Sequence, residues 1–140
     1  MKSTVRALSL GASLAIVSVA APSAMALDPI WSGEWFGAYK CGQGVTQMTL
    51  NIEAESDGRM SARFDFSSPS TSESLPSWTP LGSFSMEGNF TGDNFRLKAT
   101  SWIKQAYGYS PVDLSGSMVS AGEIQASVSG CGSITMRRWQ

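Results

Sequence analysis

The stretch that decides the fold is WSGEWFGAYKC, from Trp31 to Cys41. Every second residue in it is a large ring, a glycine or the final cysteine, and in a β-strand these alternate residues share one face. Glycine between large rings lets neighbouring backbones come close together. The stretch therefore predicts the opening strand of a closed β-barrel.

Seven further segments show the same alternation of apolar and polar residues, separated by Gly, Asp, Asn and Ser. Eight strands with one apolar face each predict an all-β fold, in which the apolar faces meet in a sandwich or in a closed barrel. The apolar sets that follow the first strand are Met48, Leu50, Ile52; Met60, Ala62, Phe64, Phe66; Phe84, Met86, Phe90; Phe95, Leu97, Ala99; Val112, Leu114, Met118; Ile124, Ala126, Val128; and Ile134, Met136.

The lengths of the connections favour a consecutive, up-and-down order of strands. Three connections are of hairpin size, namely 55–58, 91–94 and 120–122. The other four are longer, or carry cysteine or aromatic residues, namely 41–44, 67–81, 104–110 and 129–132. In an up-and-down barrel these four connections share one end.

The two cysteines fit the same arrangement. Cys41 lies at the end of the first strand and Cys131 at the start of the last, so they meet at one end if these two strands pair. We therefore expect an eight-stranded antiparallel up-and-down barrel with a Cys41–Cys131 disulfide. Two free thiols are the alternative.

The beginning of the chain has the pattern of a cleaved signal peptide. Lys2 and Arg6 precede an apolar run, and Ala24-Met25-Ala26 has the form of a cleavage site. We expect a signal peptide over 1–26, cleavage after Ala26, a single domain over 27–140, and a periplasmic or secreted location. The alternative is an uncleaved anchor helix. No later segment approaches the roughly 20 apolar residues that a membrane span needs.

Charge narrows the range of partners. Without Lys2 and Arg6 the ten basic residues of the chain fall to eight, against eleven acidic residues, and no basic run occurs. Nucleic acid is therefore not an expected partner. We expect a monomer.

The segment Gly33-Glu34-Trp35 resembles the G-x-W start of the first strand in lipocalins and related calycin-type barrels. In those families a basic side chain from the last strand packs over this tryptophan. The resemblance implies the same role here for Arg137 or Arg138, with Gly33 and Trp35 as structural residues. A weaker resemblance, at Ser32-Gly33-x-Trp35, is to the small periplasmic barrels that inhibit secreted metalloproteases.

The choice between the two arginines depends on the pairing register. If Cys41 faces Cys131 directly, antiparallel pairing places Trp35 opposite Arg137. A bulge at Gly130 or Gly132 would place Arg138 there instead.

Catalysis has little support in the sequence. The chain has no histidine, and oxidised cysteines would leave no thiolate for catalysis or metal binding. We therefore expect no enzyme activity, no cofactor and no metal. Carboxylate pairs remain the alternative, either Glu53 with Asp65 or Glu34 with Glu123.

The end of the barrel that carries the long connections is the candidate site. It gathers amphipathic rings, which suit a small apolar or amphipathic ligand. Two alternatives are a protein-facing patch that docks on or inhibits a secreted or periplasmic hydrolase, and rings that only plug the barrel. The candidate residues are Gln43, Trp78, Trp102, Lys104, Tyr107 and Tyr109.

Two further expectations concern packing. Tyr107 and Tyr109 are expected to lie outside the core. The inward-facing Gly88 and Gly116 are expected to leave space among the large interior side chains.

Overall fold

The computed structural model describes residues 11, 26–42, 44–67 and 79–138. Within these residues the chain forms eight strands and no helix. The strands are β1 (Gly33–Cys41), β2 (Gly44–Ala54), β3 (Arg59–Ser67), β4 (Gly82–Thr91), β5 (Asn94–Lys104), β6 (Leu114–Ser120), β7 (Glu123–Val128) and β8 (Ser133–Arg138).

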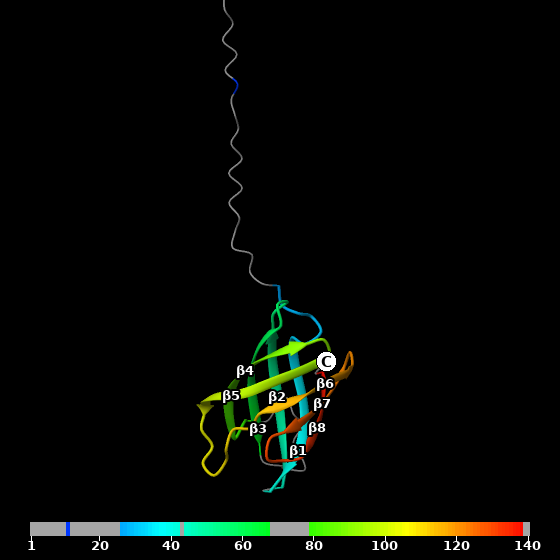
Figure 1. Ribbon diagram of the computed structural model, residues 1–140. Helices are drawn as coiled ribbons and strands as arrows, with labels where there is room; N and C mark the ends of the chain where they lie inside the picture. The colour runs from blue at the N-terminus through cyan, green and yellow to red at the C-terminus, as the bar shows by residue number, and fades with distance from the viewer. Residues whose placement is uncertain (1–10, 12–25, 43, 68–78, 139–140) are drawn as a thin grey trace, which may run out of the picture.

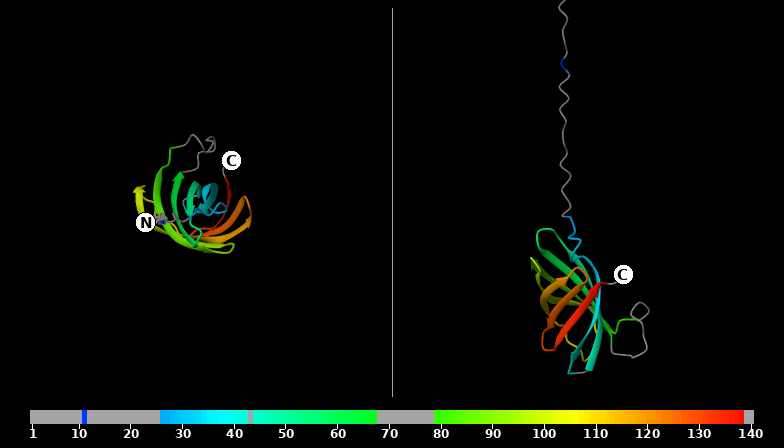
Figure 2. Two further views of the ribbon diagram at one scale, coloured as in Figure 1. Left: turned by 90° about the horizontal axis from the view of Figure 1, so that it is seen from above. Right: turned by 90° about the vertical axis from the view of Figure 1, so that its right-hand side faces the viewer.

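The strands form one closed barrel in consecutive order (Figure 1). Each strand pairs antiparallel with the next, and β1 pairs with β8 to close the ring. Seen from above, the strands curve around a common interior (Figure 2). The predicted eight-stranded up-and-down barrel is confirmed, and the sandwich is excluded. The predicted signal peptide over 1–26 lies almost entirely outside the described residues and stays a prediction.

The two ends of the barrel differ as the connection lengths predict. We call the end with the β1–β2, β3–β4, β5–β6 and β7–β8 connections the mouth, which lies toward the bottom of Figure 1. The opposite end, with the short hairpin turns and residues 26–32, is the closed end. The predicted disulfide joins Cys41 to Cys131 at the mouth, with the two Cα atoms 4.6 Å apart.

The barrel interior is filled by the alternate side chains of all eight strands. Met48, Leu50 and Ile52 on β2, for example, are buried while Asn51 and Glu53 are exposed. The largest fully buried side chains are Trp35, Phe64, Phe84, Met48, Leu50, Ile52, Met86, Leu97, Leu114, Ile124, Ile134 and Met136. An eight-stranded barrel is just wide enough to be filled by such side chains.

Gly88 and Gly116 do not leave space in this interior, contrary to expectation. A Cβ atom on Gly88 would lie 1.8 Å from the carbonyl oxygen of Arg96, and one on Gly116 would lie 2.1 Å from that of Gln125. Both glycines are therefore needed where neighbouring backbones come very close.

The first strand begins two residues later than the alternation predicts. Trp31 lies in a turn before β1, where the Asp28 carboxylate accepts hydrogen bonds from the backbone N–H groups of Ile30 (2.8 Å) and Trp31 (3.0 Å). The Trp31 ring is buried and lies 5.3 Å from the ring of Phe95. Trp31 therefore closes the barrel end rather than extending the strand.

The β1–β8 register corrects one expectation. Trp35 pairs with Arg138, not with Arg137. The reason is that Cys131 precedes β8, and the N–H of Gly132 donates to the carbonyl oxygen of Lys40 (3.1 Å). Cys41 therefore does not face Cys131 directly, and the Arg138 alternative is the one observed.

Arg138 joins the first and last segments of the barrel. Its guanidinium lies 4.5 Å from the centroid of the Trp35 ring. It also donates hydrogen bonds to the carbonyl oxygens of Ser32 (2.8 Å) and Ile30. Arg137, by contrast, is exposed and pairs with Glu123 (3.0 Å).

Arg138→Gln should lower the free energy of unfolding by about 2 kcal/mol, because it removes a cation–π contact and charge-assisted hydrogen bonds. The matched variant Arg137→Gln removes the same charge from the neighbouring position but breaks only an exposed ion pair, and should lower stability by less than about 1 kcal/mol. Urea unfolding of both variants measures the difference. Equal losses would show that Arg138 does not hold the closed end.

Candidate ligand site at the barrel mouth

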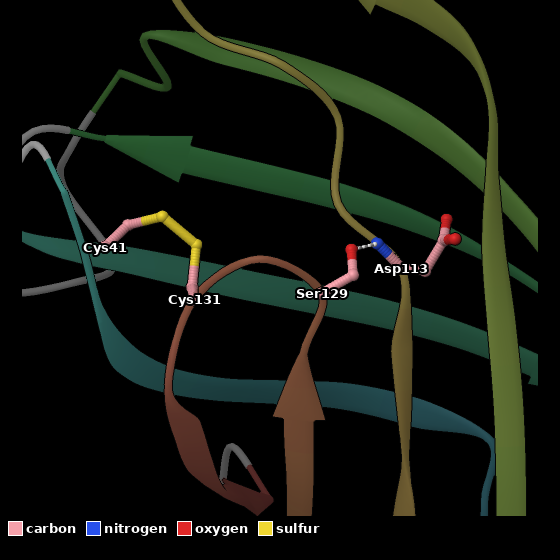
Figure 3. The surroundings of a disulfide bond; sticks show 4 residues. All are labelled: Cys41, Asp113, Ser129 and Cys131. Atoms are coloured by element: carbon pink, nitrogen blue, oxygen red, sulfur yellow. Dashed lines mark hydrogen bonds between the residues drawn. A yellow bond between two sulfur atoms is a disulfide. The ribbon is translucent and has the colours of Figure 1, made fainter.

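The disulfide and the β5–β6 connection border the mouth. Figure 3 shows Asp113, just before β6, donating its backbone N–H to Ser129 Oγ (2.8 Å) beside the Cys41–Cys131 disulfide. The same Asp113 accepts a hydrogen bond at Oδ1 from the N–H of Ala99 on β5 (2.9 Å). These bonds tie the middle of β5 to the residue before β6 and to the residue after β7, on one side of the mouth.

A pocket of about 250 Å³ opens beside the disulfide. Phe66 and Phe84, both members of the core, belong to its apolar lining. Hydroxyl groups come from Tyr39 on β1, Thr46 on β2 and Tyr109 in the β5–β6 connection. The other lining residues are Cys41, Gly108, Ser110, Pro111, Val112, Ser129, Gly130 and Cys131. The described residues that line this mouth pocket carry no charged side chain.

Burial of Tyr39 changes the titration of its hydroxyl group. Burial raises the pKa of Tyr39 to about 12, and the neighbouring Tyr109 adds to the rise. A side-chain hydrogen bond with Thr46, the cross-strand partner of Tyr39, lowers the pKa and so offsets part of this rise. The Tyr39 hydroxyl is therefore neutral at physiological pH and can donate or accept a hydrogen bond.

The raised pKa predicts a loss of stability at alkaline pH. The ordinary value is 10.0, so between about pH 10 and pH 12 the unfolded chain releases the Tyr39 proton while the folded chain keeps it. This contribution to stability is full below pH 10 and falls as the pH rises through the window. Tyr39→Phe should show a shallower fall across the same window in urea unfolding. Identical slopes for wild type and variant would contradict the raised pKa.

Two of the predicted site residues meet at the mouth. Trp102 and Tyr109 both pack against Phe66, with ring centroids 6.2 Å and 5.3 Å apart. Trp102 also lies edge-on to Phe84, at 5.8 Å. Both side chains are half-buried and cover the core. Tyr109 therefore does not lie outside the core, and the expectation for it was wrong because its ring reaches back over Phe66.

The other predicted site residues have different surroundings. Tyr107 is 88% exposed, as expected, and does not line the pocket. Lys104 Nζ donates to the carbonyl oxygen of Pro80 (2.7 Å) and so holds the chain that enters β4. Gln43 and Trp78 lie outside the described residues.

Tyr39 and Thr46 are site residues that the sequence reasoning did not select. Their inward orientation could have been predicted from the alternation, because Tyr39 shares a strand face with Trp35, and Thr46 shares one with Met48. The signal was therefore an inward-facing hydroxyl near the mouth end of each strand.

Exposed apolar side chains surround the mouth. Ile103 is 52% exposed, Val45 44% and Leu81 40%, and each stands at or beside the mouth end of a strand. Tyr107 adds an exposed aromatic ring to this group.

The carboxylate pairs have other partners. Glu123 pairs with Arg137, and Asp65 pairs with Arg63 (2.9 Å). Neither carboxylate lines the mouth pocket. In the described part of the chain, no group of His, Cys, Asp and Glu side chains is suited to hold a metal ion.

Comparison of the chain with protein-family models, with curated proteins and with solved structures gives no match. The described segments also contain no helix of the length and hydropathy needed to cross a membrane.

Proposed function

We propose that the protein is an exported binding protein that takes one small, uncharged amphipathic ligand in the mouth pocket. The observation that carries this proposal is the pairing of an apolar surface, Phe66 and Phe84, with the hydroxyl groups of Tyr39, Thr46 and Tyr109. Sites that bind small molecules combine apolar side chains with polar groups that fix the orientation of the ligand.

Pocket size limits the ligand. Drug-sized ligands occupy pockets of roughly 300 to 1,000 Å³, whereas an apolar cavity of about 150 Å³ accommodates benzene. The mouth pocket, at about 250 Å³, fits a single substituted ring. Because large side chains fill the barrel below it, the ligand stays at the mouth rather than entering the barrel.

The chemistry of the lining favours binding over catalysis. An uncharged lining would leave a ligand's carboxylate or ammonium group without a partner, so neutral ligands are favoured. Tyr39, whose pKa burial raises to about 12, holds its proton too tightly to act as a general base near neutral pH.

Two tyrosines separate ligand binding from other roles of the mouth. With p-cresol and indole as probes in titration calorimetry, Tyr109→Phe should weaken binding about threefold to tenfold, because it removes one hydroxyl and keeps the packing on Phe66. Tyr107→Ala should leave the affinity unchanged, since Tyr107 does not line the pocket. Absence of saturable binding for both probes, or equal weakening by both variants, would contradict the proposal.

A second candidate function is docking on a secreted or periplasmic protein, such as a hydrolase that the barrel inhibits. The exposed ring of Tyr107 and the exposed Ile103 favour it, because aromatic anchors often dominate interface energies. In that case Tyr107→Ala would weaken capture of the partner and Tyr109→Phe would have little effect. The two tyrosine variants thus give opposite results for the two candidates.

The lipocalin-like resemblance is compatible with the ligand-binding proposal. The barrel order and the packing of Arg138 on Trp35 agree with what the resemblance implies. We therefore propose a calycin-type barrel whose ligand site is a shallow pocket at the mouth rather than a deep central cavity.

A further inference from the structure

Strand β5 has a free edge near the mouth. It pairs with β4 from Asn94 to Lys104, but with β6 only from Asn94 to Leu97. In the described part of the chain, residues 98–104 have no partner strand on the β6 side. Figure 1 shows β5 continuing toward the mouth beyond the start of β6.

Asp113 marks the point where the two strands separate. Its Oδ1 accepts the N–H of Ala99, so a side chain takes the place of the next bond in the ladder. Figure 3 shows the Asp113 carboxyl group pointing toward the ribbon of β5 while the connection leads away from it. The fork is therefore fixed in place, and the edge beyond it is preformed.

The free edge has the composition of a pairing strand. Thr100, Trp102 and Ile103 are β-branched or aromatic residues, and Ile103 is exposed. An unpaired strand edge presents backbone N–H and C=O groups in a row, and extended peptides bind such edges by adding a strand.

The charge on β5 indicates what kind of peptide fits. β5 carries Arg96, Lys98 and Lys104 and no acidic residue. Elsewhere Arg59, Arg63 and Arg137 are already paired with carboxylates. β5 is thus a basic strand in a chain that carries more acidic than basic residues.

An outer-surface cleft lies beside the fork. It has a volume of about 280 Å³ and is lined by Arg96 and Lys98, by the Asp113 carboxylate, and by Ser115, Ser127 and Ser129. Two cations face one carboxylate that already accepts a hydrogen bond from Ala99. The cleft therefore suits an acidic side chain.

We propose that the free edge of β5 binds a short, extended, acidic peptide segment of a partner protein as an added strand. The backbone of the segment pairs with residues 100–104, beyond the Ala99–Asp113 hydrogen bond, and an acidic side chain enters the cleft beside Arg96 and Lys98. This site lies on the outer edge of the barrel, and its cleft shares Ser129 with the lining of the mouth pocket. Register shifts between β4 and β5 bend this edge, which disfavours flat pairing of two copies of the protein and favours a short peptide.

The probe is a short, blocked peptide of alternating glutamate and threonine, titrated into the purified protein. A lysine–threonine peptide of equal length should bind at least about tenfold more weakly. Methylation of alternate backbone nitrogens in the glutamate peptide should abolish binding, because it removes the strand donors and keeps the charge. The Arg96→Gln, Lys98→Gln double variant should weaken binding about fivefold to tenfold.

The matched control is Lys40→Gln, which removes an exposed positive charge from β1 and should leave the affinity unchanged. Equal binding of the N-methylated peptide would overturn strand addition. Equal weakening by Lys40→Gln would show that the peptide is held by general charge attraction rather than by the cleft. A stable dimer in sedimentation experiments would show that the edge pairs with a second copy of the protein instead of a peptide. Failure of the glutamate peptide to bind would also overturn the proposal.

Discussion

The free energy of unfolding of the Cys41→Ala, Cys131→Ala double variant should be about 4 to 5 kcal/mol lower than that of the wild type. The disulfide joins positions 90 residues apart, so it removes much of the conformational freedom of the unfolded chain. It also holds the mouth end of the β1–β8 seam, where strand pairing runs only from Trp35 to Ala38. Urea unfolding followed by tryptophan fluorescence measures the loss.

Reduction of the wild-type protein provides the control for this variant. It breaks the same bond without changing side-chain volume, so it should lower stability by a similar amount. A loss below about 1 kcal/mol in both experiments would show that the strands close the barrel without the disulfide. We also expect either change to weaken ligand binding, because both cysteines line the mouth pocket.

Gly88→Ala should lower the free energy of unfolding by about 3 kcal/mol or more, or prevent folding. The added Cβ would lie 1.8 Å from the carbonyl oxygen and 2.8 Å from the carbonyl carbon of Arg96. These are backbone atoms of β5, so relief requires the two strands to move apart rather than a side chain to turn.

The matched control is Gly122→Ala in the β6–β7 turn. A Cβ atom on Gly122 would meet no heavy atom within 4 Å, and its φ is not positive. This substitution should change stability by less than about 0.5 kcal/mol. Similar effects of the two substitutions in urea unfolding would contradict the close approach of β4 and β5.

The fold could be predicted because strand alternation is a strong signal. Residues such as Met48, Leu50 and Ile52 fix which face of a strand is buried, and the short turns fix which strands are neighbours. The cysteines then fix how the ring closes. Trp31 was placed wrongly because alternation continues through the Asp28-capped turn, and side-chain pattern alone does not reveal where a ladder begins.

The register at the closing seam could be predicted only to within one residue. The turn from Ser129 to Gly132 sets it, and pattern does not show which turn residue enters the ladder. The sequence therefore left both Arg137 and Arg138 open as the partner of Trp35, and the backbone geometry of the structure was needed to identify Arg138. A shift of one residue in the β1–β8 register changes the arginine that lies opposite Trp35, and the observed register places Arg138 there.

The sequence predicts only part of what the structure places at the mouth. Topology brings Trp102 and Tyr109 to the mouth, as expected. Pattern could not show that the buried Tyr39 and Thr46 line the pocket there, or that Gly88 serves a close strand contact. The pocket lining depends on how far each neighbouring ring extends over the core, and the Gly88 contact depends on how closely the backbones of β4 and β5 approach.

Chemical-shift mapping with p-cresol tests the central claim most directly, because it locates binding on the protein. The account predicts saturable shifts of the backbone amides of Tyr39, Thr46 and Tyr109, with no change at Trp31 and Phe95 at the closed end. Absence of saturable shifts, or shifts centred on the closed end, would contradict a ligand site at the barrel mouth.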